Sequence, residues 1–333
     1  MYTADEKRYS EMNYRRCGLS GLKLSEISLG FWHNFGTYSD YNTTEEIVRY
    51  AFDHGVTSFD LANNYGPLYG SAEERFGEIL KKNFLPYRDE MIISSKAGYD
   101  MWQGPYGEGG SKKYLIASCN QSLKRMNLEY VDIFYHHCPD PETPLYETME
   151  ALSQLVRSGK ALYVAISNYP LELALEAKRI LEDEWHISPI LNQVSYSILN
   201  RENDDRDNLF LGLKQNGIGT IVFSPLSQGL LTDKYLSGSI PEVCRAKENK
   251  FLTESSIDGA MVKKLNKLNA IAASRGQSLS DMALTWVLSK ENITSVIVGA
   301  RNKDQIAKSI AALKTNRSYS AEEDRKIIQI ASE

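Results

Sequence analysis

TTEEIVRYAFDHGVTSFDLA, residues 43–62, reads as an amphipathic helix, a glycine and a buried strand in succession. The apolar residues of the helix recur at its period and form one stripe, made of Ile47, Val48, Ala51 and Phe52. A threonine at the start is the expected N-cap, and Gly55 is the expected left-handed residue at the end. The strand, residues 56–62, shows no clean polar alternation, which is typical of strands buried on both faces. The stretch therefore predicts one helix-to-strand step of a parallel α/β fold.

The same unit recurs along the chain. Seven further apolar runs have strand length and are separated by amphipathic stretches of helix length: 27–32, 91–98, 131–137, 162–168, 190–196, 219–225 and 295–300. One intervening helix opens with Ser71 and carries Glu74 three residues later, the spacing of a capping box. Eight parallel strands close a barrel, so we predict a (β/α)8 TIM barrel. An open doubly wound sheet is the competing fold, and the lack of a GxGxxG motif after the first strand disfavours it.

The segments outside these units also have readable patterns. Residues 13–26, NYRRCGLSGLKLSE, alternate around two glycines and predict a β-hairpin that covers the barrel floor. The connection before the last strand is about 70 residues long and includes a helix near 258–274, and long loops of this kind hold ligand contacts in barrels. A last amphipathic helix, 321–330, should pack outside the barrel. Because no linker or low-complexity segment interrupts the chain, we expect residues 1–333 to form a single domain with its core at about 13–315.

Composition excludes several function classes. The net charge is -5 and the basic residues are dispersed, which disfavours a nucleic-acid partner. No window approaches 18 apolar residues and the N-terminus lacks the apolar core of a signal peptide, so we expect no membrane span and a cytoplasmic protein. The four cysteines contain no CxxC pair and are expected to be reduced thiols: Cys17, Cys119, Cys138 and Cys244.

Candidate chemistry lies at the carboxyl ends of three predicted strands, where barrels hold their functional groups. Strand 56–62 offers Asp60 and, five residues later, Tyr65, while strand 91–98 offers Lys96 in an otherwise uncharged run. A buried lysine is rare unless paired, so a purely structural ion pair with Asp60 is one interpretation. In the functional interpretation the pair lowers the pKa of the tyrosine, which then donates a proton to a developing alkoxide.

Two adjacent histidines end strand 131–137, and they point to opposite faces. His137 shares its face with Val131 and Ile133, whereas His136 shares its face with a charged residue. Branched apolar side chains fill barrel interiors, so His137 is the histidine expected in the lumen, unless a bulge shifts the register. There a neutral imidazole can orient a carbonyl oxygen. Cys138 beside the pair invites a zinc interpretation, but three consecutive residues cannot converge on one ion, and we predict no metal.

Six motifs resemble the aldo-keto reductases, over about residues 13 to 315: FDLANNYG (59–66), SKAGYDMW (95–102), YVDIFYHHCPD (130–140), GKALYVAISNY (159–169), FSPLSQGLLTDKY (223–235) and IVGARNKDQI (297–306). Three more stretches resemble the branch that contains bacterial L-glyceraldehyde 3-phosphate reductases and potassium-channel β-subunits: GFWHNFG (30–36), LANNYGP (61–67) and KAGYDMWQGPYG (96–107). The resemblance implies a (β/α)8 barrel that binds NADP(H) without a Rossmann fingerprint. It also implies a hydride-transferring oxidoreductase of the EC 1.1.1 type, with four catalytic residues: Asp60, Tyr65, Lys96 and His137.

The resemblance further implies the cofactor contacts. Ser167, Asn168 and Gln193 would hold the nicotinamide carboxamide, with Tyr196 stacked on its ring, although Tyr196 alone would be read as a core aromatic. Lys234 and Arg301 would bind the adenosine 2′-phosphate, although both would otherwise be solvated surface charges. The remaining implied contacts are Trp32, Asp60, Ser224, Pro225, Leu226, Gln228, Gly229, Gly299 and Gln305.

The adenosine end departs from the family pattern. Many relatives have Ser-Arg or Lys-Ser where this chain has Arg301 and Asn302, and an acidic residue and asparagine where it has Lys308 and Ser309. Two added cations favour a phosphorylated cofactor.

Substrate contacts are expected from the aromatic mouth and from the loop GPYGEGGSKKY, residues 104–114; the side chains are Trp32, His33, Tyr65 and Trp102. Ser111, Lys112 or Lys113 could meet an anionic group, although a solvated helix start is the plainer interpretation. The resemblance implies reduction of small aldehydes or ketones, such as L-glyceraldehyde 3-phosphate or methylglyoxal-like compounds. An NADP(H)-binding sensor with little turnover and a metal-dependent barrel hydrolase are the alternatives. A small carbonyl substrate is the expected partner, and a homo-oligomer is possible in such folds.

Overall fold

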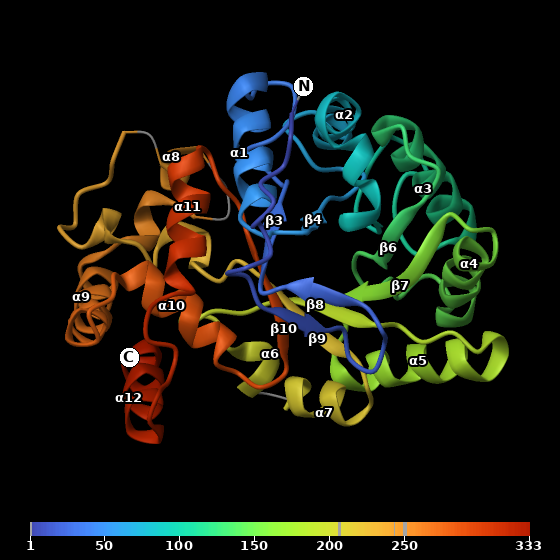
Figure 1. The fold of residues 1–333 in the computed structure, drawn as a ribbon. Helices are drawn as coiled ribbons and strands as arrows, with labels where there is room; N and C mark the ends of the chain where they lie inside the picture. The colour runs from blue at the N-terminus through green and yellow to red at the C-terminus, as the bar shows by residue number, and fades with distance from the viewer. Residues whose placement is uncertain (1, 206–207, 243, 249–251) are drawn as a thin grey trace.

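A closed barrel of eight parallel strands forms the centre of the computed structural model, which describes residues 2–205, 208–242, 244–248 and 252–333 (Figure 1). The strands follow the barrel in the order β10-β3-β4-β5-β6-β7-β8-β9. Their bounds are β3 (Ile27–Gly30), β4 (Ser58–Asp60), β5 (Ile92–Ala97), β6 (Val131–His136), β7 (Ala161–Ser167), β8 (Leu191–Ser195), β9 (Gly219–Phe223) and β10 (Ile293–Val298). The predicted (β/α)8 barrel is therefore confirmed, and the open sheet is excluded.

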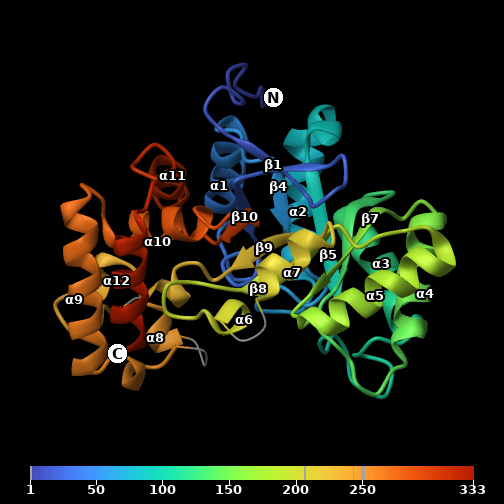
Figure 2. The same cartoon turned by 90° about the horizontal axis from the view of Figure 1, so that it is seen from below.

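Helices surround the barrel on its outer side (Figures 1 and 2). The longer ones are α1 (Tyr41–Asp53), α2 (Ser71–Ile79), α3 (Lys112–Met126), α4 (Leu145–Arg157), α5 (Leu171–Trp185), α9 (Gly259–Ser274), α10 (Leu279–Leu288), α11 (Lys303–Ala312) and α12 (Ala321–Ser332). The shorter ones are α6 (Glu202–Asp205), α7 (Leu209–Gln215), α8 (Arg245–Glu248), the π-helix η1 (Leu80–Phe84) and the 3₁₀ turns η2 (Leu85–Glu90), η3 (Ser227–Gly229), η4 (Asp233–Tyr235) and η5 (Glu254–Ser256). The helices expected near 258–274 and 321–330 are thus present as α9 and α12, which pack against each other.

Two helix starts differ from the sequence prediction. The N-cap of α1 is Asp40, whose carboxylate accepts a 2.7 Å hydrogen bond from the amide of Thr43. The helix therefore begins earlier than the threonines, because the aspartate already satisfies its first amides. The N-cap of α2 is Gly70 in a left-handed conformation, and Ser71 is the first helical residue, so the predicted capping box does not form. Gly55 does follow α1 with a φ of 82°, as expected.

The N-terminal hairpin closes the bottom of the barrel. Strands β1 (Tyr14–Arg16) and β2 (Lys23–Ser25) pair antiparallel. Cys17 and Leu24 from this hairpin belong to a small buried cluster with lumen side chains, among them Ile133 and Tyr135 of β6. The next residue along β6, Phe134, belongs instead to the larger cluster between the strands and the helices. Alternation along β6 therefore separates lumen from outer layer, as the sequence predicted.

Candidate active site

A buried ion pair occupies the carboxyl end of strands β4 and β5. Nζ of Lys96 lies 2.7 Å from Oδ2 of Asp60 and donates a 2.8 Å hydrogen bond to the carbonyl of Leu61. The two strands are neighbours, with Asp60 paired to Ser94, so both side chains project into the same part of the lumen. Burial lowers the pKa of Lys96, and the carboxylate of Asp60 opposes that shift. The pair is thus a buried charge arrangement that depends on both partners.

The second oxygen of Asp60 is also held. Its Oδ1 accepts a 3.0 Å hydrogen bond from Nε2 of Gln193 and a 3.2 Å hydrogen bond from the hydroxyl of Ser94. Gln193 comes from β8, which lies opposite β4 in the barrel order. Its amide nitrogen is therefore directed at the carboxylate, and a contact with the nicotinamide carboxamide stays a prediction. The carboxylate is fixed by side chains from two other strands, β5 and β8, so its orientation is part of the barrel core.

Tyr65 lies in the loop after β4 and completes the cluster. Its hydroxyl is 3.4 Å from Nζ of Lys96, which lies 4.8 Å from the centroid of the tyrosine ring. The sequence led us to expect a lowered pKa, but burial and the carboxylate of Asp60 raise the pKa of Tyr65 well above its usual value. The main reason is burial, because desolvation disfavours the charged phenolate, and the nearby carboxylate of Asp60 adds to the shift. Tyr65 is therefore protonated at neutral pH, the form that a proton donor needs.

The two histidines of the β6 end face different surroundings. The ring of His137 lies 5.7 Å from that of Tyr65 and 4.7 Å from that of Tyr99. Nδ1 of His136 instead lies 2.6 Å from the hydroxyl of Tyr169, on the side of the helical layer. Burial, helped by the positive charge of Lys96, lowers the pKa of His137 well below its usual value. His137 is thus a neutral imidazole beside Tyr65 and Lys96.

Ser167 and Asn168 form the end of β7 next to His137. The hydroxyl of Ser167 donates to the carbonyl of Gln193 at 2.9 Å. Asn168 has a left-handed backbone with a φ of 61°, and its side-chain amide donates to the carbonyl of His137 at 3.2 Å. A left-handed asparagine is uncommon and here tightens the turn after the strand. The two side chains lie at the lumen mouth, where a nicotinamide contact was predicted.

Tyr196 is not available at the mouth in this conformation. It is only 2% exposed, and its ring stacks on Trp286 with centroids 5.7 Å apart. The predicted stacking of Tyr196 on the nicotinamide needs a side chain on the lumen face, whereas the structure places this side chain on the outer face. Leu191 belongs to the lumen cluster and Val194 to the outer one, so Tyr196 continues the outward face.

Phe223 is the aromatic residue that sequence reasoning missed. It ends β9, is half-buried, and packs against the same lumen cluster as Ile221 two residues earlier. The spacing of Ile221 and Phe223 was the available signal, because residues two apart share a strand face. Phe223 therefore offers an aromatic surface at the mouth, where Tyr196 does not.

The loop after β9 has an unusual backbone with several left-handed residues. Four of its residues adopt left-handed conformations: Ser224 (φ 56°), Ser227 (φ 46°), Gln228 (φ 58°) and Gly229 (φ 97°). Three of them are not glycine, and such strain collects at ligand-binding segments. The hydroxyl of Ser224 accepts from Nε2 of Gln228 at 2.9 Å, which orders the turn. The amides of Ser227 and Gly229 donate to carbonyls within the loop, and a contact of this segment with a pyrophosphate stays a prediction. Pro225 is buried in the same turn and Leu226 is half-buried.

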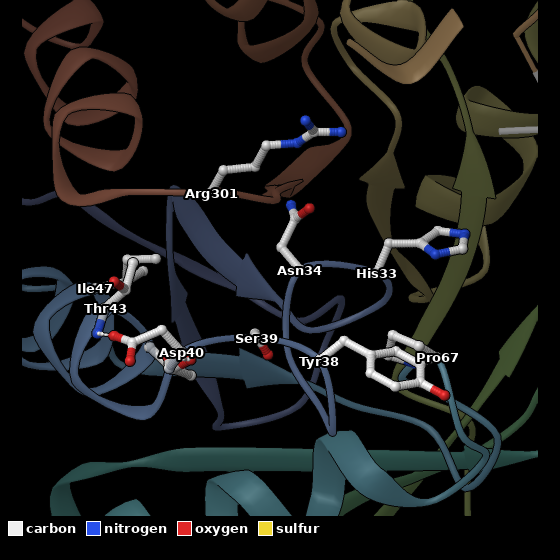
Figure 3. A pocket seen from close by; sticks show the side chains of 10 residues that line it. His33, Asn34, Tyr38, Ser39, Asp40, Thr43, Ile47, Pro67 and Arg301 are labelled. Atoms are coloured by element: carbon white, nitrogen blue, oxygen red, sulfur yellow. Dashed lines mark hydrogen bonds between the residues drawn. The ribbon is translucent and has the colours of Figure 1, made fainter. Parts of the chain in front are cut away.

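A pocket of about 410 Å³ lies between the loop after β3, the start of α1 and Arg301. Arg301, His33 and Asn34 line it together with the start of α1, and Pro67 connects it to the loop that carries Tyr65. In Figure 3 the side chain of Arg301 extends over Asn34, while Asp40 lies toward Thr43 on another side. The four predicted catalytic residues do not line this pocket. It has one cationic side chain among its lining residues, that of Arg301.

The remaining predicted cofactor residues lie around α11 and the long loop. Oε1 of Gln305 accepts a 2.9 Å hydrogen bond from the amide of Arg301, and Asn302 caps the helix. Lys308 and Lys234 are both exposed, as is the backbone of Gly299. The hydroxyl of Ser309 donates to a carbonyl of its own helix, that of Gln305. Roles for these residues in binding adenosine stay predictions.

The side chains predicted to contact the substrate also contact their own neighbours. The rings of Trp32 and His33 lie 3.9 Å apart, and Trp102 packs on Tyr114 at 5.1 Å. Nζ of Lys112 forms a 2.8 Å ion pair with Glu150 of α4, so its charge is directed to the helical layer. The neighbouring Ser111 caps α3 and accepts from the amide of Tyr114, and the ammonium of Lys113 lies over the ring of Tyr106.

Comparison with known proteins gives a consistent answer. The family model described as the aldo/keto reductase family matches residues 26–331. The chain belongs to the aldo/keto reductase family. It is 52% identical to the L-glyceraldehyde 3-phosphate reductase of Escherichia coli O157:H7, with 99% of this chain and 95% of the relative covered. The corresponding protein of E. coli K12 is 50% identical over the same shares of the two chains. A probable voltage-gated potassium channel subunit beta of Arabidopsis thaliana is 35% identical, over 91% of each chain.

The resemblance seen in the sequence is therefore confirmed, including the branch, and this aldo/keto reductase is placed among the oxidoreductases. Within the described parts of the chain, no group of three His, Cys, Asp or Glu side chains could hold a metal ion. Those same parts contain no helix long and apolar enough to cross a membrane.

Proposed function

We propose that this chain is an NADPH-dependent carbonyl reductase in which Tyr65 donates the proton. The observation that carries the proposal is the contact between the protonated hydroxyl of Tyr65 and Nζ of Lys96, at 3.4 Å, beside a neutral His137. When bound, NADPH supplies the hydride. Tyr65 protonates the carbonyl oxygen, and Lys96 stabilises the charge that the tyrosine acquires. The imidazole N–H of His137 orients the same oxygen.

The cofactor part of the proposal is supported by the fit of several segments. The left-handed loop 224–229 suits a pyrophosphate, and Ser167 and Asn168 lie where a carboxamide would need partners. Phe223 offers the aromatic surface that Tyr196 does not. Arg301, which lines the pocket, and the exposed Lys234 and Lys308 favour a 2′-phosphorylated cofactor over its unphosphorylated form.

Small aldehydes are the proposed substrates, with a phosphorylated triose as the first compound to test. The support is the name and the 50–52% identity of the two E. coli reductases. The decisive experiment is an initial-rate screen of small aldehydes, with and without a phosphate group, using NADPH and NADH separately. We expect turnover with NADPH and at least one aldehyde. No oxidation of bound NADPH by any aldehyde in the panel would contradict the proposal.

A sensor that binds NADP(H) with little turnover is the second candidate, favoured by the 35% identity to a channel subunit. Stopped-flow mixing of the NADPH complex with the aldehyde panel separates the two. Oxidation within seconds supports the reductase, while tight binding without oxidation supports the sensor.

Cytoplasmic location and self-association complete the proposal. The four cysteines form no disulfide, which fits a reducing compartment. Three leucines are 48–83% exposed and offer apolar surface for a contact between copies: Leu19, Leu162 and Leu211. Light scattering after gel filtration measures the oligomeric state.

A further inference from the structure

Tyr99 is an exposed aromatic residue that covers His137. It lies three residues after Lys96, in the loop between β5 and α3, and its side chain is 43% exposed. Its ring nevertheless contacts the imidazole of His137 edge-on, with centroids 4.7 Å apart and an interplanar angle of 75°. His137 itself is only 7% exposed. The ring of Tyr99 is itself exposed, so its own burial does not explain why it lies over the buried His137.

The backbone around Tyr99 places its ring over His137. Gly98 approaches the neighbouring strand so closely that an added Cβ would lie 3.0 Å from Cβ of His137 and 3.1 Å from its amide nitrogen. The carbonyl of Gly98 accepts a 2.7 Å hydrogen bond from the amide of Gly109, which closes the loop at its base. A glycine at this point therefore lets the chain turn directly over the histidine.

Hydrogen bonds also hold the backbone of Tyr99 in place. Its carbonyl accepts a 2.6 Å hydrogen bond from the hydroxyl of Tyr114, a fully buried residue of α3. That hydroxyl accepts a 2.9 Å hydrogen bond from the side-chain amide of Asn63, whose own backbone amide donates to the carbonyl of Lys96. The chain of contacts connects the position of Tyr99 to the strand that carries the lysine. Loop and catalytic cluster are thus one hydrogen-bonded unit.

We propose that Tyr99 is a positioning residue, whose ring holds the imidazole of His137 against the Tyr65 side and keeps water away from it. The inference rests on the proposed role of His137 in carbonyl reduction. The groups that face His137 are Lys96 from β5, Tyr65 from the β4–α2 loop and Tyr99 itself, whereas the neighbouring His136 points to the helical layer. Lys96 disfavours a second positive charge there, and the cover by Tyr99 removes the water that would otherwise stabilise it.

The first test measures the histidine directly. The chain has five histidines, so NMR of protein labelled at histidine Cε1 resolves them, and the spectrum of His137→Gln assigns the signal of interest. In the wild type we expect no titration of His137 between about pH 8 and pH 6. In Tyr99→Ala we expect its pKa to rise toward the ordinary value of about 6.5, so that titration becomes visible near pH 6. Tyr99→Phe, which keeps the ring, should behave as the wild type.

Tyr146→Ala is the matched control, because Tyr146 is 49% exposed and its ring contacts only a distant aromatic residue, Trp185 of α5. It should leave the His137 signal unchanged. The proposal is overturned if His137 in Tyr99→Ala titrates as in the wild type, or if Tyr99→Phe and Tyr99→Ala give the same change.

The second test uses catalysis. With an aldehyde that the wild type reduces, Tyr99→Ala should lower kcat about two- to fourfold at pH 6 and move the acid limb of the kcat profile up by about one pH unit. The Kd for NADPH should stay within about twofold, because Tyr99 is not among the proposed cofactor contacts. An unshifted profile would contradict the proposal. If the wild type reduces no aldehyde, the proposed function fails, and the NMR titration still decides whether Tyr99 shields His137.

Discussion

The side-chain amide of Gln193 donates a 3.0 Å hydrogen bond to Oδ1 of Asp60 across the full width of the barrel. The two residues lie on opposite strands, β8 and β4, and both are buried. The contact leaves Oδ2 to the lysine and fixes the plane of the carboxylate. The orientation of the buried Asp60–Lys96 ion pair therefore depends on a residue 133 positions further along the chain.

Gln193→Met removes this donor while keeping the length of the side chain. We expect the free energy of unfolding to fall by about 1.5–3 kcal/mol, since a hydrogen bond to a buried charge is lost. Urea unfolding followed by circular dichroism measures the change. An unchanged midpoint would show that Ser94 alone holds this oxygen.

Asp60 and Lys96 should be strongly coupled. Asp60→Asn and Lys96→Met each leave one uncompensated buried group, and we expect each to cost about 3–5 kcal/mol of stability. The double variant leaves no charge unpaired, so its loss should be clearly smaller than the sum of the two. Unfolding free energies of the four proteins complete the cycle. Additive losses would argue against the pair as a unit.

Tyr65→Phe tests the proton donor with the removal of one hydroxyl. We expect kcat for aldehyde reduction to fall about 10²- to 10⁴-fold, because the carbonyl oxygen loses its acid. Binding of NADPH, followed by the quenching of tryptophan fluorescence, should change by less than about twofold. Turnover near the wild-type rate would remove Tyr65 from the role proposed here.

Protonation of His136 should make the free energy of unfolding depend on pH. Burial lowers its pKa to about 4, whereas the unfolded chain protonates the same ring near its ordinary pKa of about 6.5. The unfolded state therefore binds more protons between these values, and stability falls as the pH drops from about 6.5 toward 4. His136 alone accounts for about 3 kcal/mol of this loss, and His137 adds to it in the same direction.

Urea unfolding at a series of pH values measures the slope, and His136→Gln should flatten it. At neutral pH the same variant should retain aldehyde reduction, while His137→Ala should lose most of it. A large loss of turnover confined to the His136 variant would reverse the assignment of the two histidines.

Arg301 should discriminate between the two nicotinamide cofactors. Arg301→Met is expected to raise the KM for NADPH about tenfold and to leave the KM for NADH nearly unchanged, since only the first carries a 2′-phosphate. Lys303→Met is the control, because Nζ of Lys303 lies 2.6 Å from a carboxylate oxygen of Glu46 on α1. Equal effects of the Arg301 variant on both cofactors would rule out a phosphate contact.

The sequence by itself determined the barrel and the polar side chains that stand at the ends of its strands. Eight apolar runs separated by helices, with polar residues at the strand ends, are local patterns that a parallel barrel must satisfy. The same alternation correctly separated the lumen face of β6 from its outer face. Periodicity carries this information because each residue's direction follows from its neighbours along one strand.

Tertiary structure alone decided what depends on contacts between distant segments. The pKa of Tyr65 rises because burial and Asp60 act on it together, which no motif records. Tyr196 turns to the core and Phe223 to the mouth, since the register of each strand in the closed barrel fixes their faces. The cover of His137 by Tyr99 likewise requires a glycine turn, a buried tyrosine and an asparagine from three separate segments. Their effects on burial, charge and orientation arise only where the folded chain brings them together.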